Sequence, residues 1–204
     1  MAERDTSRTH VTALRVALAA VLAIVVVLGV AALIAIVLSL HVKGTSMTPT
    51  LSDQDRILID PFSDVADVER FEIVALRHDG ARIVKRVIGL PGDEVRIDPV
   101  DGGAEVFVRP HGDDGWQRVA APVWQHHWGD VRRCCDTDGT SGAQDTAVVP
   151  DGSYFVLGDN PAISDDSRVY GWVTSDGVGR ILLRVYPLDR IGEISGDFRL
   201  VPAG

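Results

Sequence analysis

A β-strand that ends in a tight turn is predicted by Arg82-Ile83-Val84-Lys85-Arg86-Val87-Ile88-Gly89-Leu90-Pro91-Gly92-Asp93. Side chains alternate between the two faces of a strand, so Lys85 shares a face with Ile83 and Val87. An amine on an apolar face is poorly hydrated, and burial lowers its pKa. Lys85 is therefore a candidate general base, although an edge lysine whose ammonium reaches water also fits this pattern. Arg86 lies on the other face, where it stays charged and free for an ion pair.

Similar short strands are predicted on both sides of this segment, separated by glycine, proline and aspartate turns. They are Arg56–Asp60, Glu72–Arg77, Arg82–Leu90, Glu94–Asp98, Ala104–Arg109, Ser153–Leu157 and Arg180–Tyr186. Strands at this spacing predict a mostly β fold, with an antiparallel sheet that folds over or forms a partly open barrel.

Residues 101–149 interrupt this pattern with a polar, glycine-rich composition. We interpret them as a small inserted subdomain that divides the β core into residues 41–100 and 150–204. Neighbouring histidines on a strand point to opposite faces, so His126 and His127 are poorly placed to bind one zinc ion with Cys134. Cys134 and its neighbour Cys135 could form a strained vicinal disulfide, pair with another molecule, or be incidental in a variable loop. We expect no metal and no cofactor.

Residues 16–40 contain only apolar or small side chains apart from Ser39. As a helix they would span about 37 Å, enough to cross a hydrocarbon core of about 30 Å. A cleavable signal peptide has an apolar region of only about 7–15 residues, so we predict an uncleaved anchor rather than a buried core helix. No second apolar run follows, which predicts a single crossing.

The charges that flank this span predict its orientation. Arg4, Arg8 and Arg15 lie in the preceding tail, residues 1–15, and Lys43 follows the span. This bias places the N-terminus in the cytoplasm and the rest of the chain outside the cell membrane. The net charge of −9 argues against nucleic acid as a partner.

A candidate nucleophile follows the span in Gly44-Thr45-Ser46-Met47-Thr48-Pro49-Thr50-Leu51. A serine hydroxyl attacks only when a base removes its proton, and an ordinary lysine has about one neutral amine in 2,500 at pH 7. Lowering its pKa to about 7 requires about 4–5 kcal/mol, which burial can supply. Ser46 and Lys85 would then form a Ser/Lys pair, although serine beside glycine and proline is also ordinary in turns.

A third segment is Val149-Pro150-Asp151-Gly152-Ser153-Tyr154-Phe155-Val156-Leu157-Gly158-Asp159-Asn160, which continues through Ser164-Asp165-Asp166-Ser167-Arg168 to Gly171. By itself, its acidic loop could suggest calcium, but it lacks a repeating pattern of ligands. In order and spacing, the three segments resemble bacterial type I signal peptidases, the membrane-bound serine proteases that remove signal peptides from exported proteins. The resemblance covers nearly all of the chain except residues 101–146.

The resemblance implies a role for individual residues. Ser46 would be the nucleophile, Lys85 the general base, and Ser164 a hydroxyl that binds and orients the Lys85 amine. Some members carry a serine two positions before the nucleophile that stabilises the oxyanion. Gly44 stands there in this chain, so the Ser46 backbone N–H would carry more of that role. The residues that would form an ionic scaffold are Asp159, Asp166 and Arg168, which could include Arg86.

The sequence also suggests how a substrate would bind. Ser46 lies six residues past Leu40, within about 20 Å of the membrane even if the chain is extended. A signal peptide, with its Ala-x-Ala-like residues before the cut, could add as a strand beside Arg82–Val84. Shallow pockets would be lined by Val42, Met47, Leu51, Ile83 and Val84. The expected partners are exported preproteins and the lipid bilayer, and we expect a monomer.

Two other functions fit part of this pattern. A self-cleaving Ser/Lys repressor relative can share the β architecture, but the apolar anchor and the acidic charge disfavour it. A membrane-tethered β module that binds exported peptides without cleaving them would differ by failing to react with serine-directed acylating probes.

Overall fold

The computed structural model describes residues 3–60, 68–124, 128, 146–174, 177–194 and 196–203, with side chains from residue 12 onward. His126, His127, Cys134 and Cys135 lie outside the described residues. The chain divides into two compact units, Met1–Ser39 and Leu40–Gly204.

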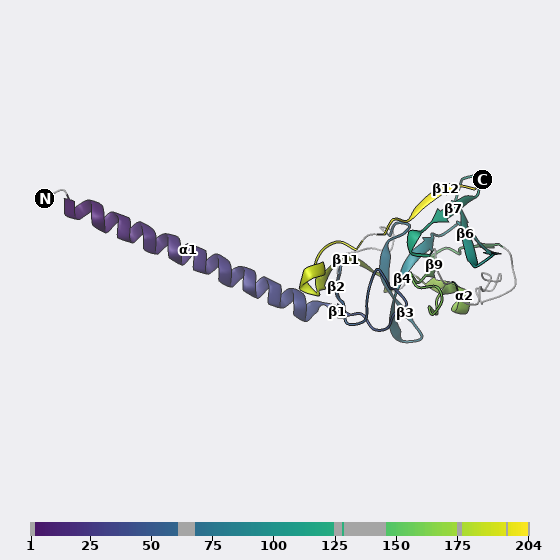
Figure 1. The fold of residues 1–204 in the computed structure, drawn as a ribbon, viewed down its shortest axis with the longest axis horizontal. Coiled ribbons are helices and arrows are strands. Elements are labelled where there is room, and N and C mark those ends of the chain that lie inside the picture. Colours follow the sequence, from purple (N-terminus) through teal and green to yellow (C-terminus); the bar gives the residue numbers. More distant parts are fainter. Residues whose placement is uncertain are drawn as a thin grey trace. The chain divides into compact units, whose positions relative to one another are not determined.

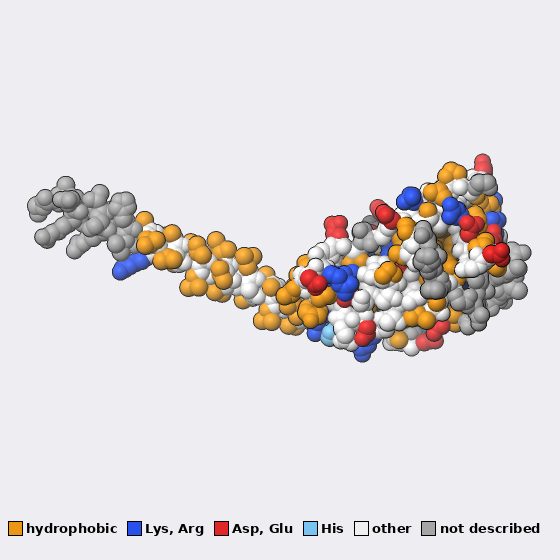
Figure 2. All heavy atoms as spheres, in the orientation of Figure 1, with side chains coloured by type: hydrophobic (Ala, Val, Ile, Leu, Met, Phe, Trp, Pro, Cys, Tyr) orange, Lys and Arg blue, Asp and Glu red, His pale blue; other side chains and the backbone are white. Residues whose placement is uncertain are grey.

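The first unit is a single helix, α1, which spans Glu3–Leu38. Its stretch Thr12–Leu38 has 27 residues, a mean hydropathy of 3.4 and no buried part. Figure 2 shows hydrophobic side chains along the described length of this helix. At about 1.5 Å per residue the stretch is long enough to cross a bilayer. The expected apolar helix is therefore present, but it ends at Leu38, and Leu40, the last residue of the predicted span, begins a strand. Its topology stays a prediction.

Most strands of the second unit belong to a seven-stranded antiparallel sheet in the order β1-β2-β11-β3-β4-β9-β10 (Figure 1). Its strands are β1 (Leu40–His41), β2 (Arg56–Ile59), β3 (Ile73–His78), β4 (Ala81–Gly89), β9 (Ser153–Leu157), β10 (Val173–Thr174) and β11 (Gly179–Tyr186).

A second sheet has five strands in the order β12-β7-β6-β5-β8. They are β5 (Glu94–Val100), β6 (Gly103–Arg109), β7 (Gln117–Ala120), β8 (Ala147–Val148) and β12 (Arg199–Pro202). Short helical turns complete the unit: η2 (Pro122–Trp124), α2 (Ser167–Tyr170) and η3 (Leu188–Arg190).

The main hydrophobic core joins the two sheets. Ile88 of β4 and Phe155 of β9 pack with Val95 of β5 and Val108 of β6, all fully buried. A second core contains Val74 and Val87, and a third lies under the turn that carries Ser46. The predicted mostly β, antiparallel fold is thus confirmed, and neither sheet closes into a barrel within the described residues.

The seven predicted strands are all present, and their ends differ from the predicted ones by at most two residues. The five that the sequence did not reveal have two to four residues, and strands this short carry little alternation. Of the strands this short, only β2 was recognised. Within the predicted insertion, β6 and β7 extend the sheet of β5, and Trp124 and Trp128 pack into the main core. The domain boundaries at residues 101 and 149 stay a prediction.

Candidate active site

Ser46 lies in a turn outside the two sheets. The turn begins at Gly44, whose φ of +84° favours glycine and whose N–H donates to Asp53 Oδ1 at 2.9 Å. Leu51 N donates to the Met47 carbonyl at 2.8 Å and closes the turn. Met47 and Leu51 are 2% and 0% exposed, so their burial in the third core fixes the turn from below.

Lys85 reaches this turn from β4. Its Nζ donates a hydrogen bond to Ser46 Oγ at 2.8 Å, and the residue is 5% exposed. Ile83 and Val87, two positions away on either side, both pack with the second core, as the alternation predicted. Burial lowers the pKa of the Lys85 ammonium, and the nearby carboxylates of Asp166 and other aspartates only partly oppose this effect.

Arg86 forms a buried ion pair on the opposite side of β4. Its Nε and Nη2 donate to the two carboxylate oxygens of Asp159 at 2.8 and 2.6 Å. Its Nη1 donates to the Phe71 carbonyl at 2.7 Å, and its guanidinium lies 4.0 Å from the ring centre of Phe198. Both charged groups are therefore fully paired in a water-poor environment.

Asp166 and Arg168 form a separate ion pair. Asp166 caps α2 and accepts from Arg168 Nε and Nη2 at 2.8 and 2.9 Å. Its Oδ2 also accepts from Gly158 N, while Arg168 Nη2 donates to the Pro161 and Ser164 carbonyls. The scaffold that we expected thus consists of two pairs, and Arg86 belongs to the pair with Asp159.

The predicted hydrogen bond from Ser164 to the Lys85 amine is not made. Ser164 Oγ is buried and has no hydrogen-bond partner among the described residues. The loop path accounts for this: Arg168 holds the Ser164 carbonyl, and the hydroxyl lies against Gly158, where an added Cβ would come within 2.3 Å of it. The Lys85 amine bonds to Ser46 instead.

Two residues that the sequence did not indicate hold the Ser46 turn. Asn160 N donates to the Ser46 carbonyl at 2.9 Å, and its Nδ2 donates to Thr48 Oγ1 at 2.9 Å. Thr50 Oγ1 donates to Asp159 Oδ2. Both residues lie in segments that we had quoted, but their chemistry is ordinary for turns and gave no separate signal.

Ser46 and Lys85 both line a cavity of about 430 Å³. Along one wall, β4 pairs with β3 from Ala81 to Arg86 but with β9 only from Arg86 onward, so among the described residues the edge at residues 81–85 has no strand partner on that side. The lining residues are Leu40, His41, Val42, Lys43, Gly44, Ser46, Met47, Ala81, Arg82, Ile83, Val84 and Lys85. Four of the five predicted substrate-binding residues are among them; Leu51 is fully buried beneath Met47.

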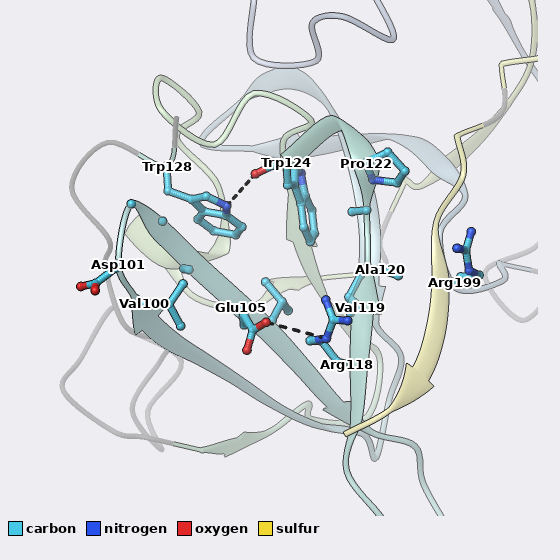
Figure 3. Close-up of a pocket in the computed structure, with 15 residues that line it drawn as sticks. Val100, Asp101, Glu105, Arg118, Val119, Ala120, Pro122, Trp124, Trp128 and Arg199 are labelled. Carbon is cyan, nitrogen blue, oxygen red and sulfur yellow. Dashed lines mark hydrogen bonds and ion pairs between the residues drawn. The ribbon is translucent and has the colours of Figure 1, made fainter. Parts of the chain in front are cut away.

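A second cavity of about 370 Å³ lies on the second sheet, beside Trp124 and Trp128 (Figure 3). Trp128 Nε1 donates to the Trp124 carbonyl at 3.2 Å. Arg118 Nε lies 3.8 Å from Glu105 Oε1. None of the predicted site residues lines it. Among the described residues, no group of three or more histidine, cysteine, aspartate or glutamate side chains is placed to hold a metal ion.

Comparison with known proteins identifies the family of the chain. Residues 14–186 match the family described as signal peptidase, peptidase S26. The chain is 33% identical to a probable signal peptidase I-2 of Synechocystis sp. PCC 6803, over 77% of this chain and 66% of that protein, just under two thirds of its length. It is 32% identical to signal peptidase I V of Bacillus subtilis, over 72% of this chain and 83% of that protein.

A crystal structure of a signal peptidase I from Enterococcus faecalis shares 28% identity with a TM-score of 0.42, covering 57% of this chain and 97% of that one. The family match alone spans well over half of the chain. This chain therefore belongs to the signal peptidase family, peptidase S26.

Proposed function

We propose that this chain is a membrane-anchored serine endopeptidase that cleaves N-terminal signal peptides from exported preproteins after small residues. Ser46 is the nucleophile and Lys85 the general base. The observation that carries the proposal is the 2.8 Å hydrogen bond from Lys85 Nζ to Ser46 Oγ at a cavity beside a strand edge that has no partner among the described residues.

The reaction requires a neutral amine. Burial disfavours the ammonium form of Lys85, and its Nζ is already within hydrogen-bond reach of the hydroxyl proton. The amine accepts that proton as Ser46 Oγ bonds to the carbonyl carbon of the last signal-peptide residue. The resulting ammonium then protonates the leaving amine of the mature protein. In the second half of the reaction, Lys85 accepts a proton from a water molecule as the water oxygen bonds to the acyl carbon. The bond from that carbon to Ser46 Oγ then breaks, and the Lys85 ammonium returns the proton to Ser46 Oγ.

The oxyanion is stabilised by the Ser46 backbone N–H. This group donates to no protein acceptor among the described residues, whereas Gly44 N–H is occupied by Asp53. A single backbone donor of this kind contributes about 3 kcal/mol to transition-state stabilisation.

The signal peptide adds as a strand along the free edge of β4 at residues 81–85. Alternate side chains of the peptide then enter the cavity, which is lined by Val42, Met47, Ile83 and Val84. Shallow pockets between these apolar side chains would admit small residues and exclude large ones. This accounts for an Ala-x-Ala-like preference. Leu51 supports the pocket indirectly by packing under Met47.

Helix α1 anchors the enzyme in the cell membrane as a single span. The arginines before the span place the N-terminus in the cytoplasm and the unit that contains Ser46 outside. The enzyme acts as a monomer without a cofactor.

The test uses the full chain in detergent, a model preprotein, and N-terminal sequencing of the product. Ser46→Ala and Lys85→Ala abolish cleavage and leave the thermal unfolding of the chain cooperative. Ser39→Ala is the matched control, because its hydroxyl donates to the Ile36 carbonyl of α1 and Ser39 does not line the cavity of Ser46 and Lys85. Normal cleavage by Lys85→Ala overturns the mechanism. A wild-type protein that binds the preprotein, does not cleave it and resists a penem-type acylating probe is instead a binding module.

A further inference from the structure

The two residues of the proposed Ser/Lys pair lie in different parts of the fold, Lys85 in a strand of the sheet and Ser46 in a turn. Lys85 is fixed in the sheet, where it is in register with Val74 of β3. Ser46 lies in a turn that belongs to no strand. The 2.8 Å separation of the two side chains therefore depends on the contacts that tie this turn to the strand of Lys85.

Thr50 makes such a contact. It lies four residues after Ser46, at the end of the turn, and is partly buried. Its hydroxyl donates to Asp159 Oδ2, and its carbonyl accepts from Arg184 Nη2. Side chain and backbone of one residue are thus held by two charged groups, which favour short and directional hydrogen bonds.

Asp159 in turn connects Thr50 to β4. This carboxylate is 1% exposed and binds Arg86, the residue that follows Lys85, through two hydrogen bonds. Thr50, Asp159 and Arg86 therefore link the turn of Ser46 to the strand of Lys85. The Lys85–Ser46 hydrogen bond closes this link into a ring of contacts.

We propose that Thr50 is a positioning residue for the cleavage reaction. Its hydroxyl holds the Ser46 turn against the Asp159–Arg86 pair and so sets the separation between the Ser46 hydroxyl and the Lys85 amine. The inference rests on the proposed roles of Ser46 and Lys85. Asn160 holds the turn at its other end through the Ser46 carbonyl, so loss of the Thr50 contact releases one end only.

The experiment replaces only the hydroxyl. Thr50→Val keeps the shape and the stiff β-branched side chain but cannot donate to Asp159. Small displacements of reacting groups cost up to about 100-fold in rate, so we expect kcat to fall by about 30-fold. KM stays within about twofold, because Thr50 is not among the residues that line the cavity. Thr50→Ser keeps the donor and retains kcat within about threefold of wild type.

Measurements are made on the detergent-solubilised full chain with a peptide that carries Ala-x-Ala before the cut. The rate of acylation of Ser46 by a penem-type probe is measured in parallel and falls with kcat. Thr174→Val, at an exposed position on β10, controls for the substitution itself. Thr50→Ala replaces Thr50→Val if the valine variant does not fold.

Three results overturn the inference: an unchanged kcat in Thr50→Val, an equal loss in Thr50→Ser, or a loss confined to KM.

A double-mutant cycle gives a further test. If Thr50 acts through Asp159, Thr50→Val adds little to Asp159→Asn, whereas additive losses contradict the link. Ser46→Ala is assayed alongside. If it cleaves normally the proposed function fails, whereas an inactive Ser46→Ala with a normal Thr50→Val contradicts only the role of Thr50.

Discussion

Lys85 and Arg86 are adjacent on β4 and leave the strand on opposite faces to complete different buried contacts. Lys85 Nζ donates to Ser46 Oγ at 2.8 Å, and Arg86 Nη2 donates to Asp159 Oδ2 at 2.6 Å. One face of the strand thus carries the proposed base and the other the ion pair that holds it in place. We therefore expect substitution of Lys85 to act mainly on cleavage and on the pH dependence of stability, and substitution of Asp159 to act mainly on the free energy of unfolding.

The first prediction concerns the pH dependence of cleavage. Burial lowers the pKa of Lys85, and only its neutral amine can accept the Ser46 proton. We therefore expect kcat to rise with pH through this lowered pKa and to reach a plateau below the ordinary lysine pKa of about 10.4. Single-turnover cleavage of a model precursor measures this profile. A rate that still rises steeply at pH 10 would mean that the amine keeps its ordinary pKa.

The same shift predicts how stability depends on pH. Between its lowered pKa in the folded protein and its ordinary pKa in the unfolded chain, Lys85 binds a proton only when the protein unfolds. The contribution of this group to stability therefore rises with pH across that window, by at most about 1.4 kcal/mol per unit. Below this pH window Lys85 is protonated in both the folded and the unfolded state. Burial of its charge then lowers the free energy of unfolding by its full amount.

Lys85→Met removes this cost while keeping a similar volume. We expect Lys85→Met to raise the melting temperature at neutral pH, and the gain to shrink as the pH approaches 10. Thermal melts of the detergent-solubilised chain, followed by tryptophan fluorescence, measure the difference. Lys43→Met is the matched control, because Lys43 is exposed and should show no such trend. A gain that is constant from pH 6 to pH 10 contradicts the prediction.

The Arg86–Asp159 pair predicts a large effect on stability. The two side chains are 2% and 0% exposed, so Asp159→Ala leaves a buried guanidinium without its counter-charge. Breaking such a pair costs about 3–5 kcal/mol. The Arg118–Glu105 pair is the control: at 3.8 Å, with both side chains about 40% exposed, it contributes at most about 1 kcal/mol. Chemical denaturation of Asp159→Ala and Glu105→Gln measures how much free energy of unfolding each variant loses. Equal losses would contradict the prediction that the buried pair contributes more than the exposed one.

Sequence alone predicted what depends on local pattern. The face of Lys85 followed from Ile83 and Val87, and strands of five or more residues were recognised from alternation and turn residues. Two-residue strands such as β1 carry no such signal. The family resemblance implied only that Arg86 could join a scaffold of aspartates and Arg168. Its partner Asp159 was not predicted, because a pairing between residues 73 positions apart leaves no local trace in the sequence.

Thr50 and Asn160 were missed for the same reason. Their partners lie more than 100 residues away in sequence, and as isolated residues they are ordinary turn formers.

The error at Ser164 has a related cause. Whether its hydroxyl reaches the Lys85 amine depends on the loop path at the scale of one ångström. That path is fixed here by Arg168 and by the close approach to Gly158.

The last prediction tests this close approach. A Cβ at Gly158 would lie 2.3 Å from Ser164 Oγ and 2.5 Å from the Ser46 carbonyl oxygen, far inside contact distance. The backbones of Gly158 and Ser46 must therefore move apart in Gly158→Ala. A displacement of about 1 Å at the nucleophile costs up to about 100-fold in rate. The destabilisation by overpacking is about 1–3 kcal/mol, so the variant should still fold.

Gly115→Ala is the matched control, because nothing lies within 4 Å of a Cβ built there and its φ is not in the left-handed region. Cleavage kinetics and thermal melts of both variants separate the two effects. We expect Gly158→Ala to lose most of its kcat at a temperature where the melt shows it folded, and Gly115→Ala to match wild type. A Gly158→Ala variant with full activity would mean that the Ser46 turn tolerates displacement, which would also weaken the argument that Thr50 must hold it.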